Sequence, residues 1–487
     1  MKKHISMRVI SLLLTLVLCV GLAAPAGAAS SDEMKVSFEK VDNSSVSAGL
    51  TGEKAPETEQ EQYSDSDIVR ASIILEEKST IEAGFSTLNI AENAEAMAYR
   101  ADLQKTQQSM ETAISQQALR GEKLDVVWNM TLAANIISAN VRYGDIEAIE
   151  NVKGVKSVVI ETRYEPCVVN KEEANDPNMA TASLMIGTPA AYAAGYTGAG
   201  SRVAVIDTGV DTDHQSFAPS GLEYSLRLNA ENDGMTYDEY VAKLDLLDAA
   251  EIAEKLDQLN IKGKDVSAEQ LYVNTKVGFG FNYVDGDLDI THDNDGQGEH
   301  GSHVEGIAAA NAYIPQGDTY VPALETVGMQ GVAPDAQIIT MKVFGKAGGA
   351  YDSDYMVAIE DAIVLGADSV NLSLGSAAAG SSRHGTAAYQ TILDNLVKSD
   401  TVVAMSAGNA GSWVENAAPV GYLYSDGVNM DTAGSPGSYT NSLGVASVDN
   451  AGSTGHYFTV NGNMVVVTES DYSNAPIASI AGEYEYI

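Results

Sequence analysis

The stretch Val-Ala-Val-Ile-Asp-Thr-Gly at residues 203–209 decides the fold of this chain. Four apolar residues run without a break and are followed by an acid, a threonine and a glycine. A short apolar run without polar alternation is typical of a strand that is buried on both faces of a parallel sheet. Functional groups gather at the carboxyl ends of such strands. Asp207 is therefore predicted to lie at the functional edge of a sheet.

Four further apolar runs have the same character and are separated by helical stretches. The runs cover residues 338–343, 369–374, 402–407 and 443–448. One intervening helix is predicted to start at a Ser353 cap, and a second to cover about 386–398. Strands that alternate with helices predict an α/β fold, a parallel sheet with helices on both faces. This region extends over residues 183–455.

A smaller unit precedes the parallel sheet, at residues 67–165. Its pattern gives strand, helix, strand, strand, helix and strand in that order. The segments are 69–75, 91–114, 126–130, 136–142, 145–152 and 155–161. This order is the split βαβ pattern of a small α+β unit. Polar segments at 29–66, which is acidic and rich in serine, and at 166–182 are predicted to be linkers.

The N-terminus has the pattern of a secretory signal peptide over residues 1–28. Basic residues precede an apolar core at 10–22, and Ala26-Gly27-Ala28 is a small-residue cleavage site. The core is too short for a comfortable membrane span, and no transmembrane segment is predicted in the mature chain. We therefore expect a secreted or cell-envelope protein. Cys167 is then the only remaining cysteine, so no intramolecular disulfide is possible.

The chain carries a formal net charge of −39. This charge argues against nucleic acid as a partner, because the phosphate backbone would repel the protein. The charge indicates nothing about the fold.

Two insertions interrupt the α/β pattern between residues 220 and 299. Residues 220–275 are predicted to hold a single acidic amphipathic helix over 237–259, and residues 285–299 form a loop dense in carboxylates. Near the C-terminus, runs at 457–460 and 464–468 flank Asn461-Gly462, which predicts a β-hairpin. Residues 456–487 are interpreted as the start of an inserted domain.

Other polar residues are predicted to lie at the same sheet edge as Asp207. The stretch His-Gly-Ser-His-Val at 300–304 places His300 at the start of a helix. Asn409 follows the strand at 402–407, and Ser-Leu-Gly at 373–375 ends another strand. Because the carboxyl ends of parallel strands meet at one edge, we expect these separated pieces to converge on one site.

Five stretches together resemble the subtilisin-like serine peptidases, the peptidase S8 family, and within it the cell-envelope group of lactocepin and the C5a peptidases. They are VAVIDTGVDTDH at 203–214, HGSHVEGIAAA at 300–310, GVAPDAQIITMKVF at 331–344, SVNLSLG at 369–375 and VVAMSAGNAG at 402–411. The unit at 67–165 resembles the inhibitory I9-type propeptide of that family. The resemblance implies a secreted serine endopeptidase, made as a zymogen and processed within 166–182. It also implies protein or peptide substrates, the chain's own propeptide as a partner and no required cofactor, and it makes 456–487 the start of a protease-associated domain.

The resemblance assigns a role to each matching residue. His300 is the general base, and Asp207 orients its imidazole and stabilises the imidazolium. Asn409 would donate its side-chain amide to the oxyanion. The substrate main chain would add as a strand to two edges beside the specificity pocket. The edge residues are Ser373, Leu374 and Gly375 on one side and Gly348 and Gly349 on the other, and the pocket wall is Ser406, Ala407 and Gly408.

The third member of the triad is missing from the sequence. No Gly-Thr-Ser stretch of the kind that carries the nucleophile follows Asn409, so we expect the chain alone to be an inactive fragment. One alternative is a truncated pseudo-protease that binds peptides without cleaving them. Another is an aspartic protease acting through Asp207, because Asp-Thr-Gly is also the signature of that class. Aspartic proteases need two such acids, and only one occurs here.

Metal binding is the remaining alternative for the acidic and histidine-rich stretches. The spacing of His300, His303 and Glu305 matches neither His-Glu-x-x-His nor its inverse. The loop at 285–295 is interpreted either as a solvated acidic loop or as a calcium site without EF-hand spacing. The candidate calcium ligands are Asp285, Asp287, Asp289, Asp293 and Asp295.

Two positions depart from the pattern of the family. Ser216 stands nine positions after Asp207, where the family often has a calcium-binding Asp, so that calcium site is not expected. Glu305 replaces the usual small residue in the helix that begins at His300.

Overall fold

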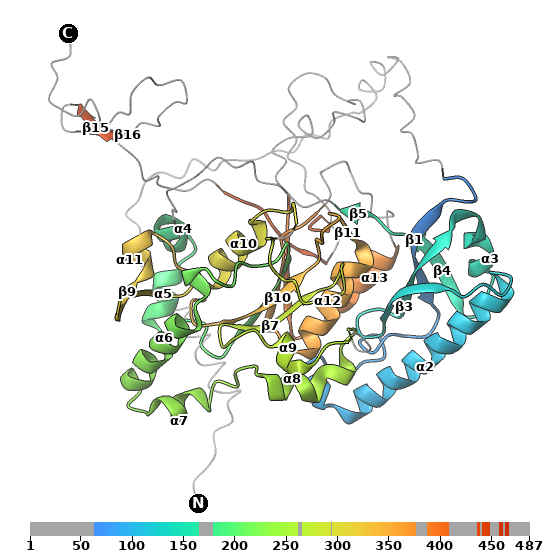
Figure 1. Ribbon diagram of the computed structural model, residues 1–487, viewed down its shortest axis with the longest axis horizontal. Coiled ribbons are helices and arrows are strands. Elements are labelled where there is room, and N and C mark those ends of the chain that lie inside the picture. Colours follow the sequence, from blue (N-terminus) through green and yellow to red (C-terminus); the bar gives the residue numbers. More distant parts are fainter. Residues whose placement is uncertain are drawn as a thin grey trace, which may run out of the picture. The chain divides into compact units, whose positions relative to one another are not determined.

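The computed structural model describes residues 63–164, 179–261, 265–293, 295–375, 387–408, 436–438, 441–448, 457–460 and 463–466 (Figure 1). Several predicted features lie outside these residues. They are the signal peptide, the acidic linker up to residue 62, Cys167, Asn409 and the Asn461-Gly462 turn. No helix in the described ranges is both long enough and apolar enough to cross a membrane.

The first unit is a four-stranded antiparallel sheet in the order β2-β3-β1-β4. Two helices complete the predicted β-α-β-β-α-β order, which the structure confirms. The strands are β1 (Ile68–Leu75), β2 (Asp125–Met130), β3 (Ile136–Arg142) and β4 (Val155–Ile160), and the helices are α2 (Ala94–Gln117) and α3 (Ile146–Glu150). Apolar residues of β1 and β3 pack with the ends of α2 and with α3 in one buried cluster.

Helix α2 begins later than the sequence predicts. A short 3-10 helix, η2 (Ile90–Glu92), precedes it, and Asn93 then adopts an extended backbone. The side chain of Asn93 accepts hydrogen bonds from the backbone of Glu95 and Ala96 at 3.2 and 3.1 Å. An asparagine in this position caps the free N–H groups of a helix, so the regular helix starts at Ala94.

The second sheet has six described strands in the order β14-β13-β12-β6-β10-β7, and every pair is parallel. The strands are β6 (Arg202–Asp207), β7 (Val277–Asn282), β10 (Gln337–Lys342), β12 (Ser369–Leu372), β13 (Val402–Ser406) and β14 (Leu443–Val445). Helices flank the sheet, so the predicted α/β class is confirmed (Figure 1). Strand β7 was not predicted, because Gly278 and Gly280 interrupt its apolar run and glycine is depleted in strands.

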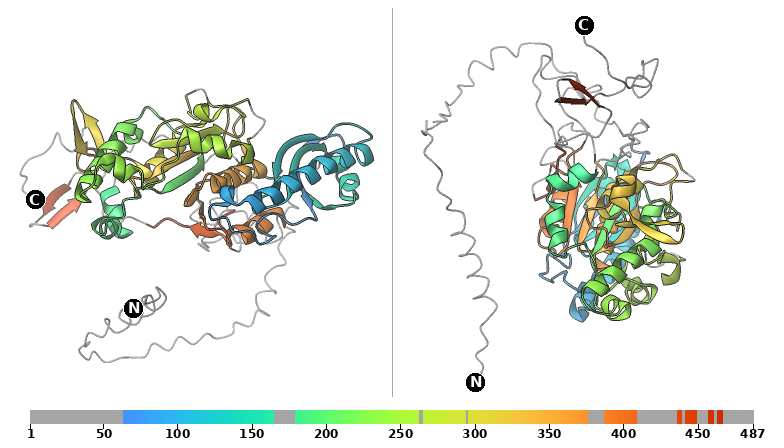
Figure 2. Two further views of the ribbon diagram at one scale, coloured as in Figure 1. Left: turned by 90° about the horizontal axis from the view of Figure 1, so that it is seen from below. Right: turned by 90° about the vertical axis from the view of Figure 1, so that its left-hand side faces the viewer.

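Helices α10 (His300–Ala309) and α12 (Asp352–Val364) contact β6 at the centre of the sheet, and α13 (Ala387–Leu396) lies between β12 and β13 in the sequence. Helix α12 is buried along its whole length. It lies between the two sheets, against β2 of the first unit and β6 of the second (Figures 1 and 2). One cluster of apolar side chains therefore continues from the first unit through α12 into the parallel sheet.

Three sequence predictions about helices are wrong in detail. The single helix over 237–259 is broken into α7 (Tyr237–Val241), α8 (Ala249–Lys255) and the 3-10 helix η5 (Leu256–Gln258). Asp245 has a left-handed backbone with φ of 51°, and Asp248 caps a new helix start. The N-cap of α12 is Tyr351 rather than Ser353, whose hydroxyl instead donates to Glu161 of the first unit. The predicted linker at 166–182 overlaps α4 (Met179–Met185).

The remaining elements surround the parallel sheet or lie near the C-terminus. They are α5 (Thr188–Ala193), η4 (Gln215–Phe217), α6 (Pro219–Asn232), α9 (Ala268–Leu271), α11 (Ala323–Val327), and the hairpins β8 (Tyr313–Gln316) with β9 (Thr319–Pro322) and β15 (Tyr457–Val460) with β16 (Asn463–Val466). The β15–β16 pair confirms the predicted C-terminal hairpin.

Candidate active site

Asp207 and His300 meet at the carboxyl edge of the parallel sheet. Asp207 ends β6 and is buried, and His300 opens α10. Nδ1 of His300 lies 2.8 Å from Oδ1 of Asp207. Because an ionised carboxylate can only accept, Nδ1 carries the proton and Nε2 is left as an acceptor. The pair that the sequence predicted is therefore formed.

Two glycines allow α10 to approach β6 closely enough for this contact. Gly209 has φ of 105°, and a Cβ there would lie 2.2 Å from the carbonyl oxygen of Ile290. A Cβ on Gly301 would lie 2.2 Å from the carbonyl oxygen of Gly209. A side chain at Gly301 would push the helix away from the turn after β6, and one at Gly209 would push that turn away from the loop at Ile290. Thr208 adds a direct link, since its Oγ1 accepts from the backbone N–H of Gly301 at 2.9 Å.

A buried ion pair, not anticipated from the sequence, supports the same edge. Nζ of Lys342, at the end of β10, donates to Oδ2 of Asp295 and to the carbonyl oxygen of Thr208, both at 2.6 Å. The side chains of Lys342 and Asp295 are 1% and 3% exposed. The pair thus joins the loop before His300 to the residue after Asp207. In the sequence, a lysine at the end of an otherwise apolar strand was the feature that could have indicated this ion pair.

The two histidines of α10 have pKa values that are shifted in opposite directions. The hydrogen bond to Asp207 raises the pKa of His300 above its usual value, with burial acting in the opposite direction. His303, one turn further along α10, has a lowered pKa because of its burial and the nearby His300. Two histidines on one helix are therefore driven in opposite directions, and the carboxylate of Asp207 accounts for the difference.

One of the two predicted substrate-binding edges pairs with the chain's own residues 163 and 164. Strand β11 (Ala350–Tyr351) follows Gly348 and Gly349 and pairs antiparallel with β5 (Arg163–Tyr164). Gly349 has φ of 56°, a left-handed backbone that favours glycine, and a Cβ there would displace the guanidinium of Arg163. The other predicted edge and the pocket wall are joined by a hydrogen bond of 3.2 Å from Oγ of Ser406 to the carbonyl oxygen of Leu374.

Comparison with known proteins identifies the family. The model of the subtilase family, Peptidase S8, matches residues 198–480, which is more than half of the chain. The chain belongs to the subtilase family.

The chain spans less than a third of the length of the two named relatives that follow. It is 31% identical over 356 residues to the PI-type proteinase of Lactococcus lactis subsp. cremoris, covering 71% of the chain and 16% of that protein. It is 27% identical over 314 residues to the minor extracellular protease Vpr of Bacillus subtilis strain 168, covering 62% of the chain and 28% of that protein. Among solved structures, the epidermin leader peptide processing serine protease of Staphylococcus aureus matches with a TM-score of 0.41 and 16% identity, covering 78% of this chain and 69% of that one.

The acidic loop of this subtilase shows no assembled metal site. The described part of the chain holds no group of three or more His, Cys, Asp or Glu placed to bind a metal ion. Asp295 pairs with Lys342, and Oδ2 of Asp285 accepts from the backbone of Lys346 at 3.0 Å. Asp287 lies 3.6 Å from Nζ of Lys346. Calcium binding by this loop stays a prediction.

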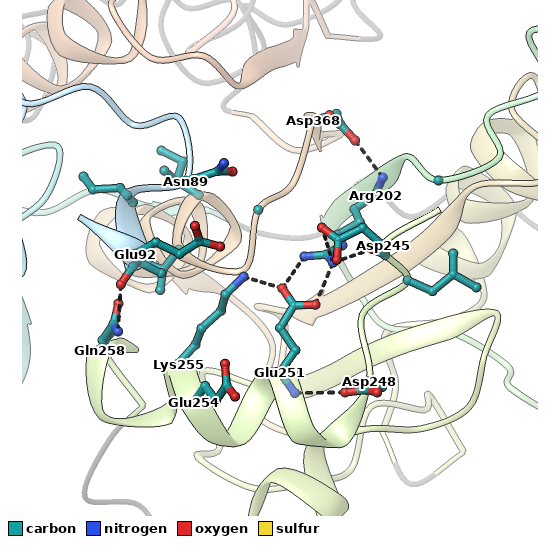
Figure 3. A pocket seen from close by; sticks show the side chains of 17 residues that line it. Asn89, Glu92, Arg202, Asp245, Asp248, Glu251, Glu254, Lys255, Gln258 and Asp368 are labelled. Atoms are coloured by element: carbon teal, nitrogen blue, oxygen red, sulfur yellow. Dashed lines mark hydrogen bonds and ion pairs between the residues drawn. The ribbon is translucent and has the colours of Figure 1, made fainter. Parts of the chain in front are cut away.

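A separate cavity of about 670 Å³ lies at the opposite end of β6 (Figure 3). Arg202, the first residue of β6, contributes to its wall and forms an ion pair with Glu251 of α8 at 2.7 Å. Lys255 contacts the same carboxylate, and Asp368 accepts from the backbone N–H of Arg202 at 2.9 Å. Because Asp207 ends the same strand, this cavity is distinct from the active site.

Proposed function

We propose that this subtilase is a secreted serine endopeptidase in which Asp207 and His300 are two members of the catalytic triad. The observation that carries the proposal is the 2.8 Å contact between Nδ1 of His300 and Oδ1 of Asp207 at the end of a buried parallel strand. A carboxylate that fixes Nδ1–H leaves Nε2 free to take a proton from a nucleophile. The pair is thereby suited to general base catalysis.

In the proposed mechanism, Nε2 of neutral His300 removes the hydroxyl proton of a serine as its oxygen attacks the substrate carbonyl. Asp207 stabilises the imidazolium that results, and His300 then returns the proton to the leaving amine. The side-chain amide of Asn409 would donate to the oxyanion. The serine is not supplied by these 487 residues, since no Gly-Thr-Ser stretch of the required kind occurs. The chain by itself is therefore expected to cleave no peptide bonds.

Residues 63–164 are proposed to act as an inhibitory propeptide in cis. Strand β5, at the end of this unit, pairs with β11 at one of the two edges predicted to bind substrate main chain. A peptide that adds as a strand to this edge competes with substrate for the same backbone groups. Cleavage between this unit and α4 would be needed for release. The signal-like residues 1–28 and the name of the extracellular relative support export of the whole protein.

The test is to read the coding sequence past codon 487 and to assay the encoded protein for peptide hydrolysis. His300→Ala is the matched variant, because it removes the base and leaves the rest of α10 unchanged. Hydrolysis that is lost in His300→Ala supports the proposal. Hydrolysis that survives this change would overturn the assigned role of the Asp207–His300 pair.

A peptide-binding protein without catalysis is the second candidate, and the β5–β11 pairing favours it equally. The two candidates differ in the nucleophile alone. A stop codon at position 488, together with saturable binding of an extended peptide by the chain, would favour the binding function.

A further inference from the structure

Glu305 is a fully buried acid in the helix that carries His300. It lies five residues after His300 on α10 and is 0% exposed. Its Oε1 accepts a hydrogen bond from Oγ1 of Thr340 on β10 at 2.9 Å. Its Oε2 is buried and has no hydrogen-bond partner within the described structure. One of its two oxygens is therefore unused.

Glu305 is not half of an ion pair in the described residues. The buried cation that influences it most is Lys276, just before β7. Nζ of Lys276 donates to the carbonyl oxygens of Pro334 and Ala336, both at 2.8 Å. An isolated carboxylate is costly to bury, so such groups take up a proton instead. Burial raises the pKa of Glu305 well above its usual value, and the charge of Asp207 raises it further.

Within the described residues, the carboxylate of Asp207 also has one oxygen with hydrogen-bond partners and one without. Its Oδ1 receives Nδ1–H of His300 at 2.8 Å and the backbone N–H of Thr208 at 2.7 Å. Its Oδ2 is buried and has no partner among the described residues. A neutral carboxylic acid is a donor, and an ionised carboxylate is an acceptor. Thr340, which donates to Glu305, pairs with Val205 on β6, two residues before Asp207, so the two carboxyl groups lie along the same pair of strands.

We propose that Glu305 is a positioning residue for the Asp207–His300 pair: it stays protonated and donates its proton, through a buried water, toward Oδ2 of Asp207. This inference rests on the proposed role of that pair in catalysis. Buried waters typically hydrogen-bond to buried polar groups that have no protein partner. The donated hydrogen bond disperses the charge of Asp207, and so limits how strongly Asp207 holds the proton on His300.

The groups that face Glu305 make the proposal testable by titration. They are Asp207 on β6 and Lys276 just before β7, and His300 and His303 are the other titratable residues of α10 itself. Asp335, before β10, acts on Lys276 rather than on Glu305. The pKa of His300 responds in opposite directions to the loss of a donor and to the loss of a negative charge, and this separates the proposal from its alternatives.

The experiment is an NMR titration of His300 in the full chain, with labelled histidine, for the native protein and the variants Glu305→Gln and Glu305→Met. Glutamine keeps a neutral donor of the same length, so the pKa of His300 should stay unchanged. Methionine keeps the length and removes the donor, so the pKa of His300 should rise by roughly one pH unit.

Two results would overturn the proposal. If Glu305 were ionised, both variants would remove a negative charge and lower the pKa of His300. If Glu305 were only a packing residue, neither variant would shift this pKa. The glutamine variant alone tests the protonated state if the methionine variant fails to fold. Asp207→Asn in the same titration tests the catalytic pair separately: an unchanged His300 there would contradict the proposed function, whatever Glu305 does.

Discussion

Buried carboxylates in two regions of this subtilase have different kinds of hydrogen-bond partner. In the active site, Asp207 faces the imidazole of His300 at 2.8 Å. Between the first unit and helix α12, Glu161 accepts from the hydroxyls of three serines at 2.7 to 2.8 Å, and Asp352 accepts from the backbone of Thr162 at 2.7 Å. Within the described structure neither Glu161 nor Asp352 forms an ion pair. One carboxylate has a titratable partner, and the others have neutral donors.

The difference decides which group holds a proton. Opposite Asp207, the proton is held by His300, whose pKa is raised by the hydrogen bond. At the interface, burial outweighs the neutral donors, raising the pKa of Glu161 and raising the pKa of Asp352 to about 8. A rise in pH therefore frees His300 to act as a base and places charge in the interface of the first unit.

The comparison predicts the largest effect for Glu360 of α12, which has both kinds of partner. Its Oε1 accepts from the backbone of Leu132 and Ala133 at 2.9 and 2.7 Å, and Arg100 lies 3.9 Å from Oε2. Glu360→Ala leaves these buried backbone donors without an acceptor and removes the carboxylate that faces the guanidinium of Arg100, which should weaken the association of the first unit by about 3 to 5 kcal/mol.

The measurement uses a full chain with a site-specific cleavage sequence inserted between residues 165 and 178. After cleavage, the dissociation constant of the first unit is determined. Lys105→Ala is the matched control, since its ion pair with Asp102 is 75% exposed on both sides and should change stability by less than about 0.5 kcal/mol. A Glu360→Ala constant within tenfold of the native value would show that the interface does not depend on this carboxylate.

The second prediction concerns pH. A carboxyl whose pKa is raised in the complex binds more protons there than when the parts separate, so association is strongest at low pH. For Asp352 the loss runs from its usual pKa of 3.8 up to about 8, by as much as tenfold per pH unit. The same cleaved chain, measured between pH 5 and 9, should release the first unit as pH rises. Asp352→Asn should flatten this dependence, and an equally steep dependence in that variant would assign it to other groups.

The smallest expected effect belongs to Asp207. In Asp207→Asn the pKa of His300 should fall toward its usual value of 6.5, because the amide does not stabilise the imidazolium. In the native chain, this pair adds stability that is fully present below pH 6.5 and is lost as pH rises through the raised pKa. Histidine NMR and thermal unfolding at pH 5 and 8 measure both effects. A His300 pKa that stays raised in Asp207→Asn would show that other groups are responsible.

The sequence predicted the parts of the site that depend on neighbouring residues. An apolar run followed by Asp207 indicated a strand end, and His300 before a glycine indicated a helix start. Convergence of the two followed from the geometry of parallel sheets. The broken helix at 237–259 and strand β7 were not predicted, because a left-handed Asp245 and two strand glycines depend on packing partners distant in the sequence.

The sequence by itself therefore determined five of the six described strands of the parallel sheet, their order along the chain and the two residues that meet at its edge. The tertiary structure alone decided which acids are buried and what each one faces. Glu161 and Asp352 look like ordinary acids in the sequence, and Glu305 stands out there only as a departure from the family pattern. Each of the three is buried and bonded to a segment far along the chain. Whether an acid is ionised depends on its burial and on the charge of its neighbours, and contacts over long sequence distances set both.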